Sequence, residues 1–250
     1  MLKAVLFDVD DTLIDWGDFN GDWAAIETPH LLRVYDYLNR EVHPIPSADD
    51  FVEQYMRRVE SQWVAARNSL RAPHVGRVLV DSAIALGVPD HAINMQDCLD
   101  AYRWTAVQQT ALFSDVVEVL TKLRARGIKM GTVTNSFYPA ALRDREFEAF
   151  GILEYFPDCR VSAADVGYLK PHPNIFRAAL DCLGLQAENV VFVGDNPTAD
   201  ITGPQRVGMR AIIRRPRRPR QTTGRLVLPD GEIDSLKELP DLLDSLYAEV

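Results

Sequence analysis

Acidic side chains crowd the end of an apolar run near the N-terminus, in the segment VLFDVDDTLIDW at residues 5–16. Asp8, Asp10 and Asp11 come directly after the run KAVLF at residues 3–7, which is typical of a buried strand. Burying a carboxylate is costly unless it is paired or bound to a metal. The segment therefore predicts that a cation lies at this strand end.

Polar residues that could share this cation follow other segments of the chain. Thr134 and Asn135 stand at the end of the run KMGTVTN, and Lys170 precedes a helix pattern that Pro171 opens. Asp195 follows the run NVVFVG, and Asp200 comes five residues later. Ligands of open α/β sheets bind beyond the carboxyl ends of the strands, so these side chains are expected along one rim.

The residue types at this rim suggest a chemistry. Hard carboxylate oxygens favour Mg²⁺, whose coordination a substrate phosphate oxygen can complete. Asp8 is rigidly placed at its strand end and could act as a covalent nucleophile that forms an aspartyl-phosphate. Asp10 could protonate the leaving oxygen and later activate water. Thr134, Asn135 and Lys170 are then expected to cradle the remaining phosphate oxygens.

The elements that would position these residues alternate between strand and helix in the second half of the chain. Apolar, β-prone runs lie at residues 3–7, 129–134, 160–164, 189–194 and 210–214. Helix patterns cover residues 114–127, 139–151, 172–184 and 235–250. This alternation predicts an α/β fold with a doubly wound parallel sheet.

A different pattern fills the chain between the first strand and the rest of the sheet. No strong strand run occurs there, and Phe51, Tyr55, Val59 and Trp63 follow helical spacing. Helices are expected from the SADD segment at 47–50 onward, and over residues 75–87 and 98–113. We expect a core domain of residues 1–14 and 112–250, with a helical cap domain of residues 15–111 inserted after the first strand.

Composition narrows the class of protein. The 250 residues carry a net charge of −9, which argues against a general nucleic-acid binder. No apolar stretch is long enough for a bilayer span or a signal peptide. Cys98, Cys159 and Cys182 form no C-x-x-C pair, which favours buried thiols in a reducing compartment. We expect a soluble, cytoplasmic protein with neither nucleic acid nor membrane as partner.

One basic segment stands out in this acidic chain. The stretch RRPRRPRQTTGR at residues 214–225 carries six arginines and follows the strand run RAIIR. It can be interpreted as a solvated loop. It can also be interpreted as a basic collar on the rim that attracts anionic substrates.

Four short motifs of this sequence resemble, in order, those of the haloacid dehalogenase-like (HAD) hydrolase superfamily. They are DVDDT at 8–12, TN at 134–135, KP at 170–171 and GDNPTAD at 194–200. The resemblance covers the core, and the inserted helical segment resembles the C1-type cap of that superfamily. It implies a Rossmann-like core with a helical cap.

The resemblance also implies roles for individual residues. Asp8 corresponds to the nucleophile and a metal ligand, and Asp10 to the general acid/base, whose backbone carbonyl also contacts the metal. Thr134 and Lys170 correspond to the residues that hold the phosphoryl group. Asp195 corresponds to a ligand of Mg²⁺.

Three further positions refine this assignment. Asp200 corresponds to a residue that supports the metal site from behind or holds Lys170. The true dehalogenases of the superfamily lack an acid two positions after the nucleophile, so Asp10 points to phosphoryl transfer. Asp11 stands where many members have glycine, and aspartate tolerates turns.

We therefore predict a Mg²⁺-dependent phosphatase that hydrolyses a small phosphorylated metabolite through an aspartyl-phosphate. A phosphomutase of the same superfamily is the main alternative, and product analysis separates the two. A signalling receiver domain fits poorly, because receivers are roughly half this length and lack the helical insertion. A catalytically idle binding protein on the same scaffold is disfavoured, because every motif residue is present.

Overall fold

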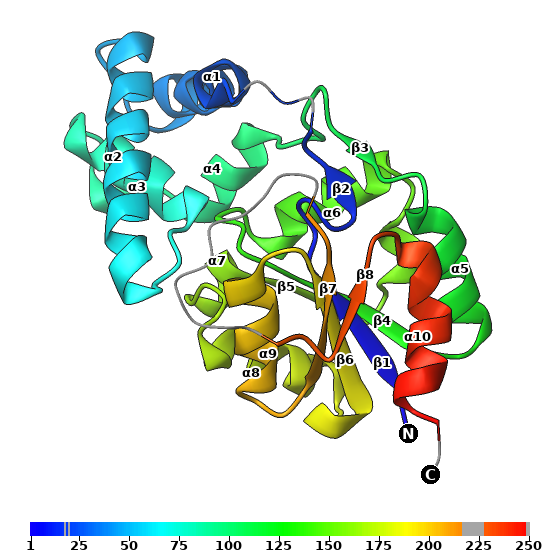
Figure 1. The fold of residues 1–250 in the computed structure, drawn as a ribbon. Helices are drawn as coiled ribbons and strands as arrows, with labels where there is room; N and C mark the ends of the chain where they lie inside the picture. The colour runs from blue at the N-terminus through cyan, green and yellow to red at the C-terminus, as the bar shows by residue number, and fades with distance from the viewer. Residues whose placement is uncertain (18, 20, 217–227, 249–250) are drawn as a thin grey trace.

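A sheet of six parallel strands forms the centre of the molecule (Figure 1). The computed structural model describes residues 1–17, 19, 21–216 and 228–248. The strand order is β5-β4-β1-β6-β7-β8, and every pairing is parallel. The strands are β1 (Ala4–Phe7), β4 (Lys129–Thr134), β5 (Cys159–Ser162), β6 (Val190–Gly194), β7 (Arg210–Arg214) and β8 (Gly231–Ile233). The predicted doubly wound parallel sheet is confirmed.

Helices cover both faces of this sheet. They are α5 (Val116–Ala125), α6 (Ala140–Ala149), α7 (Ala163–Val166), α8 (Pro173–Leu183), α9 (Gly203–Gln205) and α10 (Leu239–Leu246). Short helical turns are η3 (Leu153–Tyr155), η4 (Ala187–Asn189), η5 (Pro197–Thr202) and η6 (Leu236–Glu238). Val5 and Phe7 of β1 pack in a cluster with α5 and α10, whereas Ala4 and Leu6 pack in a cluster with α8. Burial on both faces explains why the strand runs show no polar alternation.

The predicted strands agree with the observed ones at four of five positions to within one residue. The exception is the run at 160–164, where β5 ends at Ser162 and α7 begins at once. The Ser162 side chain caps that helix by accepting a hydrogen bond from the backbone N–H of Ala164. The edge strand β8 has three residues and was not predicted from the sequence.

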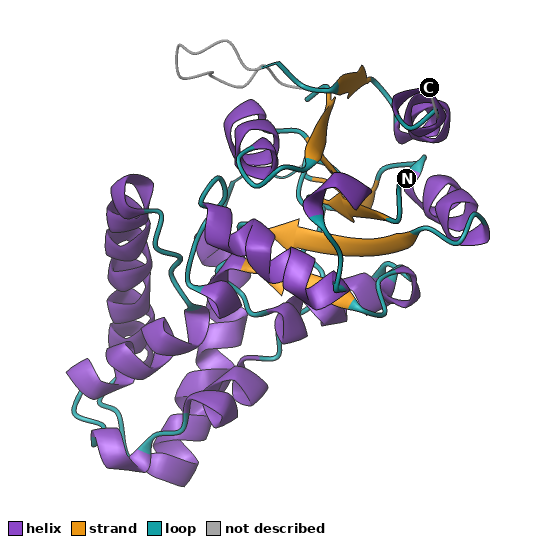
Figure 2. Ribbon diagram, turned by 90° about the horizontal axis from the view of Figure 1, so that it is seen from below, coloured by secondary structure: helices purple, strands orange, loops and turns teal. Residues whose placement is uncertain are grey.

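The segment of residues 16–110 is mainly helical and lies to one side of the sheet (Figures 1 and 2). Its elements are α1 (Trp23–Tyr37), η1 (Leu38–Val42), α2 (Ala48–Ser69), α3 (Val75–Ala85), η2 (Asp90–Ala92) and α4 (Met95–Tyr102). Phe51 and Tyr55 lie in its apolar core, as their helical spacing predicts. Ser47 caps α2, in agreement with the predicted helix start. None of the helices in the described part of the chain is long and apolar enough to span a membrane.

The predicted helix over residues 98–113 is wrong in its second half. Helix α4 ends at Tyr102 because Arg103 adopts a left-handed backbone, with φ of 51°. Trp104 then turns into the interior, where it is fully buried. Further on, β3 (Ala111–Leu112) pairs antiparallel with β2 (Ile14–Asp15).

The β2–β3 pair joins the two chain segments that connect the helical segment to the sheet. It lies at the boundaries expected from the sequence. We propose the division into a core of residues 1–14 and 112–250 and a cap of residues 15–111 on this basis.

The end of α2 is also attached to the core through the backbone. Leu169 donates a backbone hydrogen bond to the carbonyl of Leu70 at 2.9 Å, and Ala72 donates one to the carbonyl of Gly167 at 3.1 Å. This contact ties the helical segment to the loop that precedes Lys170.

Candidate active site

Asp8 and Lys170 form the buried centre of the rim. Asp8 follows β1, and its backbone N–H donates to the carbonyl of Val193 at 2.8 Å. The Lys170 ammonium donates to Asp8 Oδ1 at 2.6 Å and to the Val133 carbonyl at 3.0 Å. It lies 2.8 Å from Asp200 Oδ1. The sequence prediction that these segments converge is therefore met for Asp8, Lys170 and Asp200.

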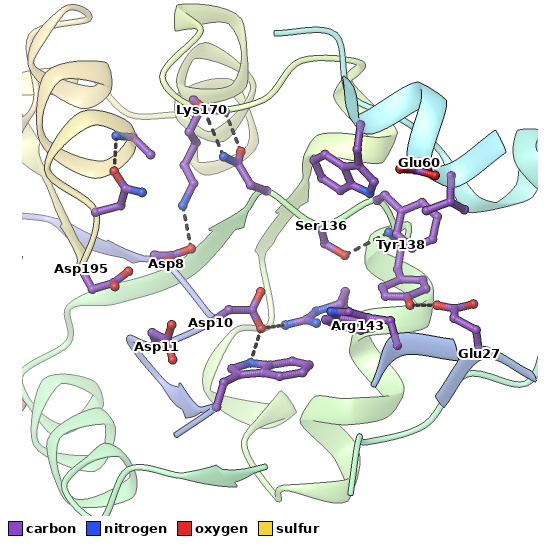
Figure 3. A pocket seen from close by; sticks show the side chains of 18 of the residues that line it. Asp8, Asp10, Asp11, Glu27, Glu60, Ser136, Tyr138, Arg143, Lys170 and Asp195 are labelled. Atoms are coloured by element: carbon purple, nitrogen blue, oxygen red, sulfur yellow. Dashed lines mark hydrogen bonds and ion pairs between the residues drawn. The ribbon is translucent and has the colours of Figure 1, made fainter. Parts of the chain in front are cut away.

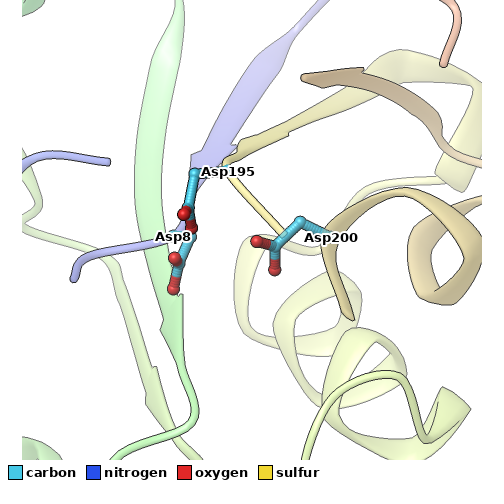
Figure 4. A group of neighbouring side chains, drawn as sticks. All are labelled: Asp8, Asp195 and Asp200. Carbon is cyan, nitrogen blue, oxygen red and sulfur yellow. The ribbon is translucent and has the colours of Figure 1, made fainter. Parts of the chain in front are cut away.

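Asp195 completes a group of three buried carboxylates with Asp8 and Asp200 (Figure 4). One oxygen from each lies within 4.8 Å of the others. Lys170 contacts two of the three acids, so the group carries more negative than positive charge when ionised. A compact set of carboxylate oxygens fits a hard divalent cation such as Mg²⁺.

The pKa values of Asp8 and Lys170 are shifted by their burial and by the charges around them. Burial raises the pKa of Asp8 to about 7, and the negative charges of Asp200 and Asp10 act in the same direction while Lys170 opposes them. Burial would lower the pKa of Lys170, but the carboxylates of Asp200 and Asp8 raise it, so the ammonium stays charged. A divalent cation beside Asp8 would favour its ionised form.

Gly194 lets Asp200 approach the end of β6. A Cβ atom at position 194 would lie 2.5 Å from the Asp200 carboxylate, so a larger residue would force the acid away. Asp200 Oδ2 accepts a hydrogen bond from the backbone N–H of Asn196 at 2.9 Å. The acid is therefore fixed between the strand end and Lys170.

Asp10 is half-buried and is held by three donors, of which Figure 3 labels Arg143. Its Oδ1 accepts hydrogen bonds from Trp16 Nε1 at 2.9 Å and from Arg143 Nη2 at 2.8 Å. Its Oδ2 accepts from the Thr134 hydroxyl at 3.3 Å. Asp11, next along the chain, has φ of 62°, which explains why this position accepts glycine or aspartate.

The residues expected to cradle phosphate differ in their placement. Lys170 and Asn135 line a cavity beside the rim, but Thr134 is not part of that lining and its hydroxyl donates to Asp10. Asn135 bonds to the backbone of Lys170 twice: Lys170 N–H donates to Oδ1 at 2.6 Å, and Nδ2 donates to the Lys170 carbonyl at 3.2 Å. Asn135 therefore orients the lysine.

Arg143 and Glu146 also belong to the site, although the sequence analysis did not identify them. Arg143 is buried and joins Asp10 to Glu146, with Nη1 3.1 Å from Glu146 Oε2. Burial raises the pKa of Glu146 to about 7 against the opposing effect of Arg143. Their spacing of three residues on the predicted helix at 139–151 could have indicated that the two side chains form an ion pair. It does not indicate which side of the helix faces the rim.

A cavity of about 640 Å³ opens between the rim and the helical segment (Figure 3). The rim contributes Asp8, Asp10, Asp11, Asn135, Lys170, Asp195, Asn196 and Asp200 to its wall, among others. The helical segment and the chain leading to it contribute Trp16, Trp23, Glu27, Tyr55, Met56, Val59, Glu60 and Trp63. Its size suits a small-molecule ligand.

The arginine-rich segment is described only at its start, since residues 217–227 lie outside the described residues. Arg214 is buried and structural: it donates to the Thr12 carbonyl at 2.8 Å and pairs with Asp115 at 3.0 Å. Arg215 pairs at the surface with Glu232 and Asp234. These two arginines therefore stabilise the fold. The other four arginines of the segment would decide whether it is a solvated loop or a basic collar.

The parallel sheet thus brings three acids and a lysine together at the carboxyl ends of its strands. The family model of haloacid dehalogenase-like hydrolases matches residues 2–208, and the chain belongs to this family. The predictions of the family and of an enzyme are confirmed.

Individual relatives match over nearly the whole chain. The chain is 30% identical to the glyceraldehyde 3-phosphate phosphatase of Methanopyrus kandleri, over 98% of this chain and 99% of that enzyme. It is 26% identical to the N-acylneuraminate-9-phosphatase of Mus musculus, over 100% and 96% of the two chains. Among solved structures, the 2-haloacid dehalogenase of Pseudomonas syringae pv. Tomato matches with a TM-score of 0.61 and 28% identity, over 98% and 99%.

Proposed function

We propose that the protein is a Mg²⁺-dependent phosphatase that hydrolyses a small phosphorylated metabolite through an aspartyl-phosphate on Asp8. The observation that carries the proposal is the group of three buried carboxylates beside Lys170, on the wall of a cavity large enough for a metabolite. The names of the full-length phosphatase relatives support the same reaction.

The acids of the rim divide into two sets in this proposal. The carboxylates of Asp8 and Asp195 and the backbone carbonyl of Asp10 would hold Mg²⁺, with Asp200 behind them fixing Lys170. When bound, the ion neutralises negative charge on the phosphate and orients it toward Asp8. Lys170 neutralises a further part of that charge.

The chain's own residues account for the bond changes. A carboxylate oxygen of Asp8 attacks phosphorus, the bond from phosphorus to the alcohol oxygen breaks, and Asp10 gives its proton to that oxygen. Water then attacks the phosphorus of the aspartyl-phosphate while Asp10 accepts a proton from it, and the bond from phosphorus to the Asp8 oxygen breaks, which releases inorganic phosphate and restores the Asp8 carboxylate. For this role Asp10 must lie within reach of the leaving oxygen. Hydrogen bonds from Trp16 and Arg143 hold its carboxylate at the cavity wall, where substrate would bind.

The neighbouring dehalogenase structure suggests a second reaction, which Asp10 argues against. A dehalogenase has no alkoxide to protonate, whereas a phosphatase needs an acid beside its nucleophile. We therefore expect no release of halide from a 2-haloacid.

Hydrolysis of p-nitrophenyl phosphate with and without Mg²⁺ tests the proposal. We expect activity that EDTA abolishes and Mg²⁺ restores, and we expect Asp8→Asn to abolish turnover while the circular dichroism spectrum and the melting temperature show a folded protein. Full activity in metal-free buffer, or turnover by Asp8→Asn near the wild-type rate, would contradict it. Chloride release from 2-chloropropionate is the matched control reaction.

A further inference from the structure

The cavity wall opposite the catalytic rim is built largely from aromatic and apolar side chains. Helix α2 presents Tyr55, Met56, Val59 and Trp63 to it, at the spacing of one helical face. Trp16, in the chain leading into α1, and Trp23, the first residue of α1, add two more rings, whose centroids lie 5.5 Å apart. This wall places several electron-rich rings beside whatever part of a substrate lies beyond its phosphate.

Two carboxylates, Glu27 and Glu60, belong to the same wall (Figure 3). Neither forms an ion pair with a basic side chain in the described part of the chain. Glu60 is exposed, but Glu27 is only 4% exposed. A buried carboxylate without a counter-ion is unusual and calls for a reason.

Three tyrosine hydroxyl groups hold Glu27 in place. Tyr55 donates to Oε2 at 2.9 Å, Tyr102 donates to the same oxygen, and Tyr138 donates to Oε1. Burial raises the pKa of Glu27, and these hydrogen bonds oppose that effect. Three donors around one carboxylate suit the ionised form, which accepts hydrogen bonds and donates none. When ionised, Glu27 therefore has three hydrogen-bond donors but no cationic partner among the described residues.

The basic residues that line the cavity are already engaged. Lys170 contacts Asp8 and Asp200, and Arg143 contacts Asp10 and Glu146. Among the described residues of the lining, no other lysine or arginine occurs. A second anionic group on the substrate would therefore meet carboxylates at this wall and no uncommitted base of the described lining.

We propose that the substrate is a phosphate monoester whose alcohol carries a positively charged nitrogen, an alkylammonium or trimethylammonium group, and that Glu27 selects for this charge. The phosphate would lie at Asp8, and the cation would lie against the aromatic wall near Glu27 and Glu60. Ring faces and carboxylates attract such a cation together. The inference rests on the proposed phosphatase function, because it identifies the chemical class of the alcohol that such a phosphatase would release.

A pair of esters of equal shape tests the charge. Phosphocholine has a positively charged quaternary nitrogen at the position where 3,3-dimethylbutyl phosphate has a neutral quaternary carbon. We expect the wild-type enzyme to show kcat/KM at least about tenfold higher for phosphocholine, the scale of a single well-placed cation contact. Equal values, or a preference for the neutral ester, would overturn the inference.

Variants at two glutamates of the helical segment sharpen the test. Glu27→Gln should bring the ratio of the two kcat/KM values close to one, and Glu60→Gln should lower it less because that side chain is exposed. Glu53→Gln makes the same chemical change on the surface of α2, where Glu53 pairs with Arg57, and should keep the wild-type ratio. A ratio unchanged in a folded Glu27→Gln and in Glu60→Gln would contradict the assignment of these residues.

Binding to the Asp8→Asn variant separates this inference from the proposed function. Titration of that variant with each ester in Mg²⁺, followed by tryptophan fluorescence, requires no turnover. Tighter binding of phosphocholine would support the cation assignment even if p-nitrophenyl phosphate were not hydrolysed by the wild type. Equal binding alongside normal hydrolysis of p-nitrophenyl phosphate would reject the cation assignment and leave the phosphatase function standing.

Discussion

The two ends of the cavity both bury negative charge, and they stabilise it in different ways. At the rim, Lys170 contacts Asp8 and Asp200 and supplies a positive charge. At the helical end, three tyrosine hydroxyls surround Glu27 and supply hydrogen bonds but no charge. The rim therefore couples Asp8 and Asp200 through a shared cation, whereas Glu27 contacts no lysine or arginine among the described residues. Removing a partner should have different consequences at the two ends.

Replacing Asp10 with asparagine should have the largest effect on the rim. If Asp10 is the general acid, as we propose, its loss is expected to slow turnover by roughly 10²–10⁴-fold. The loss should be smaller for p-nitrophenyl phosphate than for an alkyl phosphate, because a good leaving group needs less protonation. Steady-state rates on both esters measure this, and equal losses would indicate that Asp10 acts mainly through the metal site.

Lys170→Met should show what the shared cation contributes to folding. It leaves Asp8 and Asp200 buried without their positive partner, so we expect a loss of about 3–5 kcal/mol in the free energy of unfolding of the metal-free protein. Urea denaturation in EDTA measures this loss. Addition of Mg²⁺ should recover part of it. A loss below that of a typical surface substitution would mean that the acids are protonated in the wild type.

The effect of Mg²⁺ on stability should depend on pH. The pKa of Asp8 is raised from 3.8 to about 7, so in the metal-free protein the contribution of this group to stability falls as pH rises through that interval. At about pH 5 the ion must displace a proton from Asp8, and at about pH 8 it need not. At 100 times its Kd, Mg²⁺ stabilises by about 2.7 kcal/mol. The shift in melting temperature at one Mg²⁺ concentration should therefore be larger at the higher pH, and the reverse order would contradict the assignment of Asp8 as a ligand.

Tyr138→Phe should have the smallest of these effects. It removes one hydrogen bond from the buried Glu27 and is expected to cost about 1–3 kcal/mol of unfolding free energy. Tyr37→Phe is a matched control, since its hydroxyl reaches Asp97 at the surface, and should change stability by less than about 0.5 kcal/mol. Equal losses in the two variants would mean that the hydroxyl groups around Glu27 contribute no special stabilisation.

The sequence predicted the rim well because each strand could be recognised from local composition. The apolar runs that end at Phe7 and Gly194 place Asp8 and Asp195 at neighbouring strand ends once the sheet is parallel. That prediction needs no knowledge of side-chain contacts. It needs only the rule that ligands of open α/β sheets bind beyond the carboxyl ends of the strands.

The features that the sequence did not predict depend on partners far away in the chain. Arg143 lies 133 residues from Asp10, and Tyr138 lies 111 residues from Glu27. The helix pattern over 98–113 continues past Tyr102, but the left-handed backbone of Arg103 ends the helix there and Trp104 is buried in the interior. Short paired strands such as β2 and β3 have two residues each and leave no period to detect.

The backbone link between the end of α2 and the loop before Lys170 has a consequence for release of the products. An outward swing of α2 either breaks the two hydrogen bonds of Leu70 and Ala72 or pulls residues 167–169 along with the helix. In the second case Lys170, which we propose contacts the substrate phosphate, would be drawn back as the cavity opens. Opening of the cavity and weaker binding of inorganic phosphate would then both result from the same movement of α2.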